Sequence, residues 1–165
     1  MCIRDSTLYT LNVNTQTDCV GNAVGLHNTA NFGIATTSDL NDLIINEILF
    51  NPSTGGYDFV ELYNNSSKII DLGGWFFANA DVEINPDSLQ ELSPLVSERY
   101  SILPSQFLAF TPNPAFVRAY YGQCNTDIPF NGIIQCTLPS YLDDEGVVAL
   151  TDLFGGTVLD KVHYY

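Results

Sequence analysis

Apolar and polar residues alternate along several short segments of the chain, and other short segments are rich in β-branched and aromatic residues. Both patterns are typical of β-strands, in which successive side chains point to opposite faces. Turn-forming sequences such as NPSTGG, NNSSK, LGG, DDEG and FGG separate these segments. Strands at this spacing, without alternating helices, predict an all-β antiparallel sandwich. The predicted strands are YTLNVN (9–14), LIINEILF (43–50), FVELYN (59–64), FLAFT (107–111), VVALTD (147–152) and TVLDKVHYY (157–165).

One short helix is predicted within this series of strands. Asn113 is a favourable N-cap, Pro114 suits the first helical position, and Gly122 directly follows AFVRAYY. We therefore expect a helix over 114–121, inserted at the surface of the sandwich.

The polar segment TTSDLND (36–42) is the best candidate for a domain boundary. We expect residues 37–41 to form a linker and residues 42–165 to form the sandwich, which stops inside a predicted strand and is expected to be cut short there. Residues 7–36 are too few for a core of their own and are predicted to be the last strands of a truncated preceding domain. Residues 1–6, MCIRDS, resemble a translated sequencing adapter, and we interpret them as an artefact.

Composition indicates a globular protein and restricts its partners. Hydrophobic residues make up 45% of the 165 residues, and 5 Lys and Arg against 19 Asp and Glu give a net charge of −14. Such a surface repels phosphate backbones, so we expect no nucleic-acid partner. It favours cations and basic partners instead. The longest apolar segments have the length of strands, so no membrane span is predicted.

Two cysteines bracket the segment CNTDIPFNGIIQC, which follows the predicted helix. A disulfide between Cys124 and Cys136 would close this short loop, contribute about 3 kcal/mol, and indicate an oxidising compartment. Two unpaired thiols are the alternative. Cys19 is left without a predicted partner.

Three carboxylates, Glu47, Asp58 and Glu61, interrupt the apolar runs of INEILFNPSTGGYDFVELYN and are candidate Ca²⁺ ligands. In a regular strand Glu47 shares a face with Ile45 and Leu49, and pairing of the two runs would bring Glu47 and Glu61 together. Close carboxylates repel one another, and a Ca²⁺ ion with added loop carbonyls would relieve that repulsion. The alternative is structural: each carboxylate accepts hydrogen bonds from backbone N–H groups or a Tyr at the sheet rim.

Other candidate sites have weaker patterns. The segment YLDDEG (141–146) could hold a cation, but it lacks the ligand spacing of an EF-hand loop and is better explained as a solvated turn. The aromatic run WFF (75–77) could bind a glycan, although we expect Trp75 in the core. His27 and His163 have no nucleophile motif nearby, and the sequence contains no CxxC, Walker or HExxH motif. We therefore predict no catalytic residues and no cofactor other than a possible Ca²⁺.

Four segments, in order, resemble the lamin tail domain, a family with an immunoglobulin-like β-sandwich. The resemblance extends from Asp42 to the last residue, and the stretch from Asp81 to Arg99 and the helix with its cysteine pair depart from the pattern. Upstream, YTLNVNTQTDCVGNAV within residues 7–35 resembles the closing strands of bacterial immunoglobulin-like modules. The four segments are LIINEILFNP, DFVELYNNSSKIIDLGGWFF, ILPSQFLAFTP and LPSYLDDEGVVALTDLFGGTVLDKVHY.

This resemblance implies a non-catalytic module rather than an enzyme. The sequence has no heptads, basic localisation signal or prenylated C-terminal Cys as in nuclear lamins, so the bacterial branch of the family is implied. We expect a structural or interaction module, adhesive or spacer, of a secreted or cell-surface multidomain protein. Its expected partners are other domains of the same chain and extracellular protein or glycan ligands. The alternative is a Ca²⁺- or glycan-binding accessory domain of a secreted hydrolase, and a hydrolase in its own right has the least support.

Overall fold

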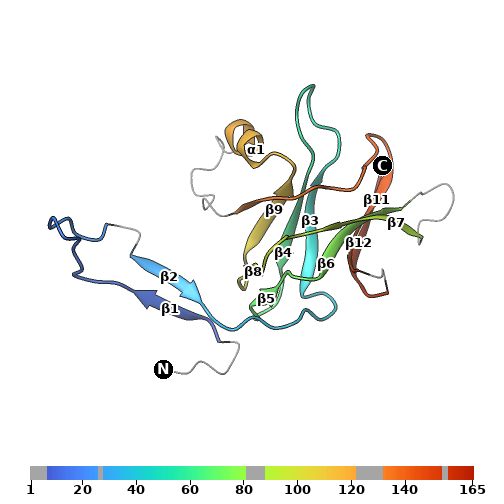
Figure 1. The fold of residues 1–165 in the computed structure, drawn as a ribbon. Helices are drawn as coiled ribbons and strands as arrows, with labels where there is room; N and C mark the ends of the chain where they lie inside the picture. The colour runs from blue at the N-terminus through green and yellow to red at the C-terminus, as the bar shows by residue number, and fades with distance from the viewer. Residues whose placement is uncertain (1–6, 26–27, 81–87, 122–131, 154–155) are drawn as a thin grey trace.

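The structure of the chain is a computed structural model that describes residues 7–25, 28–80, 88–121, 132–153 and 156–165. Among these residues, no helix has the length and apolar character needed to cross a membrane. The elements, in chain order (Figure 1), are β1 (Tyr9–Asn12), β2 (Thr29–Phe32), β3 (Leu43–Leu49), β4 (Phe59–Asn64), β5 (Ile70–Asp71), β6 (Trp75–Ala80), β7 (Leu89–Pro94), β8 (Ser101–Ile102), β9 (Phe107–Thr111), α1 (Pro114–Tyr121), β10 (Ile133–Gln135), β11 (Gly146–Asp152) and β12 (Val158–Tyr164).

Two sheets of four strands each form the body of the described chain. One has the strand order β10-β9-β4-β3 and the other β12-β11-β6-β7. Phe77 of β6 packs against Phe110 of β9 across the interface between the sheets, edge to face, with the ring centroids 5.3 Å apart. The predicted all-β, immunoglobulin-like sandwich with one short inserted helix is confirmed.

The strands with the strongest apolar patterns supply the core. β11 is buried over six of its seven residues, as expected for a strand covered on both faces. β4 alternates instead, so Val60 and Leu62 face the core while Glu61 and Tyr63 lie on the outer face of the sheet. Burial of each Leu or Ile of this core stabilises the fold by about 2 kcal/mol. Its fully buried members are Leu43, Val60, Leu62, Ile70, Leu72, Phe77, Leu95, Ile102, Leu108, Phe110, Val148 and Leu150.

A β-bulge changes the alternation that the sequence predicts for β3. Ile45 pairs with Leu62, but the next pair is Glu47 with Glu61, which leaves Asn46 without a partner in the register. Ile45 therefore packs against the core and does not share a face with Glu47. The prediction of a common face for these two residues was wrong because one inserted residue reverses the side-chain alternation.

The helix forms as predicted and changes the strand pairing beside it. The N–H of Phe116 donates to the Asn113 side-chain oxygen at 3.1 Å, which is the expected N-cap hydrogen bond. β10 follows the helix and pairs with β9 in parallel. Parallel neighbours need a crossover connection, and α1 lies in that crossover. The two four-stranded sheets are therefore antiparallel except at this edge. Gly122, the predicted stop signal, lies outside the described residues.

The aromatic run at the start of β6 divides between core and surface. Phe77 is fully buried. Trp75 is half-buried and packs against the core cluster, so the core position expected for it is only partly reached.

The first two strands form a separate hairpin, which Figure 1 shows extending away from the sandwich. Its side chains are almost all exposed, as expected for a two-stranded unit without a core. The chain joins the sandwich at Thr36, which forms a parallel bridge with Ile70 next to β5. Thr36 lies just before the predicted linker, so the chain is already held by the sandwich where that linker begins.

Candidate functional site

Glu47 and Glu61 lie side by side as register partners on the outer face of the β10-β9-β4-β3 sheet. The Asn46 side-chain amide donates to Glu61 Oε1 at 2.8 Å, so the bulge residue supplies the donor. Glu47 is exposed, and its side chain has no hydrogen-bond or ion-pair partner among the residues that the structure describes. The structural alternative expected backbone or Tyr donors for both carboxylates. For Glu61 the donor is instead the side-chain amide of Asn46. For Glu47 no described group donates a hydrogen bond to the carboxylate.

The surroundings of Glu61 disfavour its charged form. Partial burial raises the pKa of Glu61 above its ordinary value, the Asn46 hydrogen bond opposes that rise, and the negative charge of Glu47 adds to it. The repulsion between the two carboxylates is thus only partly offset by protein groups.

Asp58 does not join the other two predicted Ca²⁺ ligands. Burial, followed by the charge of Asp143, raises the pKa of Asp58. Burial and, to a smaller extent, the charge of Asp58 raise the pKa values of Tyr141 and Tyr164. Over the described ranges, no group of three or more His, Cys, Asp or Glu side chains is arranged to hold a metal ion. A Ca²⁺ ion at Glu47 would therefore need most of its oxygen ligands from outside this predicted set.

Aromatic side chains flank the two glutamates on the same face. Tyr63 and Phe107 are cross-strand partners with ring centroids 4.5 Å apart. On the other side of Glu61, Phe59 packs against Tyr121 of α1 at 6.1 Å. We call this surface the aromatic face, and its rings belong to Tyr57, Phe59, Tyr63, Phe107, Phe116, Tyr120 and Tyr121.

Sequence reasoning missed the aromatic face, although two signals could have indicated it. Alternation in FVELYN places Phe59 and Tyr63 on the face of Glu61. The AFVRAYY helix carries three aromatic residues, more than a short one-sided apolar stripe needs.

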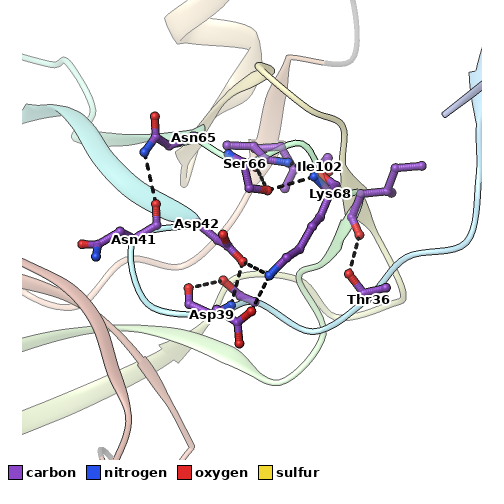
Figure 2. A network of polar contacts seen from close by, with 11 residues as sticks. Thr36, Asp39, Asn41, Asp42, Asn65, Ser66, Lys68 and Ile102 are labelled. Carbon is purple, nitrogen blue, oxygen red and sulfur yellow. Dashed lines mark hydrogen bonds and ion pairs between the residues drawn. The ribbon is translucent and has the colours of Figure 1, made fainter. Parts of the chain in front are cut away.

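A second acidic pair lies where the chain enters the sandwich, and it surrounds a lysine (Figure 2). Lys68 Nζ forms an ion pair with Asp39 and lies 2.6 Å from Asp42 Oδ2. The N–H of Asp39 also donates to Asp42 Oδ2 at 2.8 Å. We call these three residues the Lys68 clasp. It connects the predicted linker to the turn after β4, and no sequence pattern predicted a contact between segments so far apart.

The pKa of Asp42, the less exposed carboxylate of the Lys68 clasp, is lowered, whereas the pKa of Glu61 is raised. Burial would raise the pKa of Asp42, but the hydrogen bonds from Lys68 and from the Asp39 N–H, with the charge of Lys68, lower it overall. The hydrogen bonds from Lys68 to the carboxylates of Asp39 and Asp42 raise the pKa of Lys68. Both shifts favour the charged forms that make the ion pair.

Asn64 holds the backbone of the turn that carries Lys68. It is fully buried, and its amide nitrogen donates to the carbonyls of Lys68 at 2.8 Å and of Ile102 at 3.2 Å. Its side-chain oxygen accepts the N–H and the hydroxyl of Ser66. The NNSS turn therefore uses a side chain from the strand end for its hydrogen bonds.

The sequence model of the lamin tail domain family matches residues 36–165. The chain belongs to the lamin tail domain family. A comparison with curated proteins returned no match.

The landmarks of the lamin tail domain have structural explanations. Glu-Leu-Tyr-Asn ends with the buried Asn64. In Asp-Leu-Gly-Gly-Trp, the Asp71 carboxylate accepts the N–H of Gly73 at 2.9 Å, and Gly74 has a φ of 86°. Only glycine adopts that conformation without strain, so the second Gly is required for the turn between β5 and β6. The family match begins at Thr36, the residue that bridges to Ile70.

Cys136 is buried in this domain and forms no disulfide with another described cysteine. Its sulfur lies 3.2 Å from the carbonyl oxygen of Pro94, and burial raises its pKa to about 11. A thiol of this kind is protonated and unreactive at neutral pH. Cys124 lies outside the described residues, so the disulfide between these cysteines stays a prediction. Cys19, the other described cysteine, is exposed.

The acidic turn at 141–146 contains a polar group without a partner. The Tyr164 hydroxyl donates to the Leu142 carbonyl at 2.8 Å, whereas the buried Tyr141 hydroxyl has no partner among the described residues. Tyr141 lines a cavity of about 180 Å³. Glu145 Oε1 lies 3.1 Å from the His163 ring nitrogen Nε2. The other histidine, His27, lies outside the described residues.

Proposed function

We propose that this lamin tail domain is a non-catalytic interaction and spacer module of a secreted or cell-surface multidomain bacterial protein. The observation that carries the proposal is the way the chain enters the sandwich. Two contacts fix its path there: the bridge at Thr36 and the Lys68 clasp. A module that spaces and orients its neighbours needs such a fixed entry point.

The bridge at Thr36 is made by the backbone. The N–H of Thr36 donates to the Ile69 carbonyl at 2.8 Å, and its own carbonyl accepts the N–H of Asp71 at 3.0 Å. Gly33, three residues earlier, lies so close to Ile69 that a larger side chain would collide with it. The base of the hairpin is therefore packed against the sandwich as well as tethered to it.

The hairpin itself supports a neighbouring protein surface. Leu11 is 52% exposed and Phe32 is 40% exposed, although both belong to strands. Large apolar side chains exposed together mark surfaces that pack against other protein. In the proposed function they contact the rest of the preceding module.

Backbone ¹⁵N relaxation of the 165-residue chain tests the spacer role. We expect the hairpin and the sandwich to tumble with one rotational correlation time. In Lys68→Met the correlation time of the hairpin should become shorter than that of the sandwich, because the clasp is lost. Arg99→Gln removes one positive charge from an exposed side chain and serves as the control. Independent tumbling of the hairpin in the wild-type chain would contradict a fixed entry point.

A further inference from the structure

We propose that the aromatic face binds a basic segment of a partner protein, with a Lys or Arg side chain over Glu47 and Glu61. This inference rests on the proposed function as an interaction module and names the face and the kind of partner. The residues that carry it are the two glutamates, the Asn46 bulge and the rings on either side.

The first observation is the composition of the face. Phe107 is 47% exposed and Tyr120 is 57% exposed, and both rings touch other rings of the aromatic face. Aromatic residues are enriched at protein interfaces, and their ring faces attract Arg and Lys. An apolar surface of this kind on a strongly charged protein is suited to contact with another protein.

The second observation is the shape of the face around Glu61. Its cross-strand partner on β9 is Ala109, whose side chain is small. Tyr63 and Phe107 bound the position on one side, and Phe59 with Tyr121 on the other. An extended cationic side chain fits between the rings with its head at the glutamates and its stem against the aromatic surface.

The third observation is charge, and it selects the partner. The protein has a net charge of −14, and Glu47 and Glu61 lie next to each other without a basic side chain within the described part of the chain to pair with. At the other acidic pair the chain supplies Lys68 itself. A basic group from a partner would relieve the repulsion at Glu47 and Glu61 in the same way.

Titration of the ¹⁵N-labelled chain with a twelve-residue peptide of alternating Arg and Ser tests this inference. We expect amide shifts in residues 45–48, 59–63 and 107–109. Glu47→Gln and Glu61→Gln should each weaken binding by about fivefold, as for a partly exposed charge pair. Phe107→Ala should weaken it by a similar factor through lost ring contact.

Glu98→Gln is the matched control, because it removes the same charge from an exposed loop position outside the face. It should change the affinity by less than about twofold. Equal weakening by Glu98→Gln, or shifts spread over all acidic segments, would overturn the inference in favour of general charge attraction.

A neutral sugar, chitohexaose, is the competing ligand. Shifts in the same residues with chitohexaose and none with the peptide would overturn the inference and identify the face as a glycan site. That result would leave the proposed module function intact, because the hairpin relaxation experiment tests that function separately.

Discussion

The molecule contains two acidic pairs of similar chemistry in different surroundings. Asp39 and Asp42 enclose Lys68, whereas Glu61 accepts one side-chain amide, Glu47 accepts none, and neither has a cation among the described residues. The pKa of Asp42 is accordingly lowered, and that of Glu61 is raised. The charged form is thus favoured at Asp42, where the chain provides a counter-charge, and disfavoured at Glu61, where it provides none among the described residues. In the proposed interaction, a basic group of the partner supplies that counter-charge.

The largest change in stability is expected at Asn64, which holds the turn that carries Lys68. Asn64→Ala removes a buried side chain and leaves the carbonyls of Lys68 and Ile102 without donors. We expect the free energy of unfolding to fall by about 3 kcal/mol, measured by urea denaturation. Asn65→Ala is the control, because Asn65 is exposed and makes one long hydrogen bond of 3.3 Å to the Asn41 carbonyl. A loss of less than about 1 kcal/mol in Asn64→Ala would show that these carbonyls find other donors.

A smaller loss of stability is expected when Asp42 of the Lys68 clasp is replaced. Asp42 has a side chain only 14% exposed, and Asp42→Asn should lower the free energy of unfolding at pH 7 by about 1 kcal/mol. Because the folded pKa of Asp42 is lowered, its stabilisation is present above the unfolded pKa and is lost as pH falls through the folded pKa. The difference between wild type and Asp42→Asn should therefore vanish in acid. A difference that persists at low pH would show that the charge of Asp42 is not its cause.

The Tyr141 hydroxyl is a neutral polar group that, like Glu47, has no hydrogen-bond partner among the described residues. Tyr141→Phe removes a buried polar atom that has no described hydrogen-bond partner. We expect the midpoint of thermal unfolding to rise, corresponding to roughly 1 kcal/mol. Tyr164→Phe is the matched control, because it removes a hydroxyl that does donate, to the Leu142 carbonyl, and should lower the midpoint. Destabilisation by Tyr141→Phe would indicate a bound water in the cavity.

The smallest change in stability is expected at Glu47 and Glu61, the pair without a cation among the described residues. Glu61→Gln keeps a side-chain oxygen for Asn46 and removes the repulsion with Glu47. The raised pKa means that the charged form of Glu61 opposes folding at neutral pH, and this opposition disappears as pH falls through the folded pKa. Glu61→Gln should stabilise the protein at pH 7 by a few tenths of a kcal/mol, since partial exposure screens the repulsion. A clear loss of stability at pH 7 would mean that the carboxylate has a favourable partner.

Most of the fold could be predicted from the sequence because its signals are local. Alternation located β3, the content of β-branched and aromatic residues located β4, β9, β11 and β12, and the sequence around Pro114 located α1. The bulge at Asn46 could not be predicted, because a polar Asn-Glu pair within a strand does not indicate which residue is left out of the register. The short strands β5, β8 and β10 carry too few residues to show a period.

The candidate site was predicted only in part, because its contacts are long-range. Pairing of the two runs correctly placed Glu47 beside Glu61, since their strands are neighbours in sequence. Asp58 lies on the same segment but acts toward Tyr141 and Tyr164, which come from the far end of the chain. Such contacts depend on sheet packing, which a single sequence does not specify.

The most direct test of the comparison is the measurement of both carboxyl pKa values by NMR titration of ¹³C-labelled side chains. We expect the pKa of Asp42 below its ordinary value of 3.8 and that of Glu61 above its ordinary value of 4.5. Lys68→Met should raise the pKa of Asp42 and leave that of Glu61 unchanged. A lowered pKa at Glu61 in the isolated chain would contradict the account, because it would mean that the protein already supplies a cation to this pair.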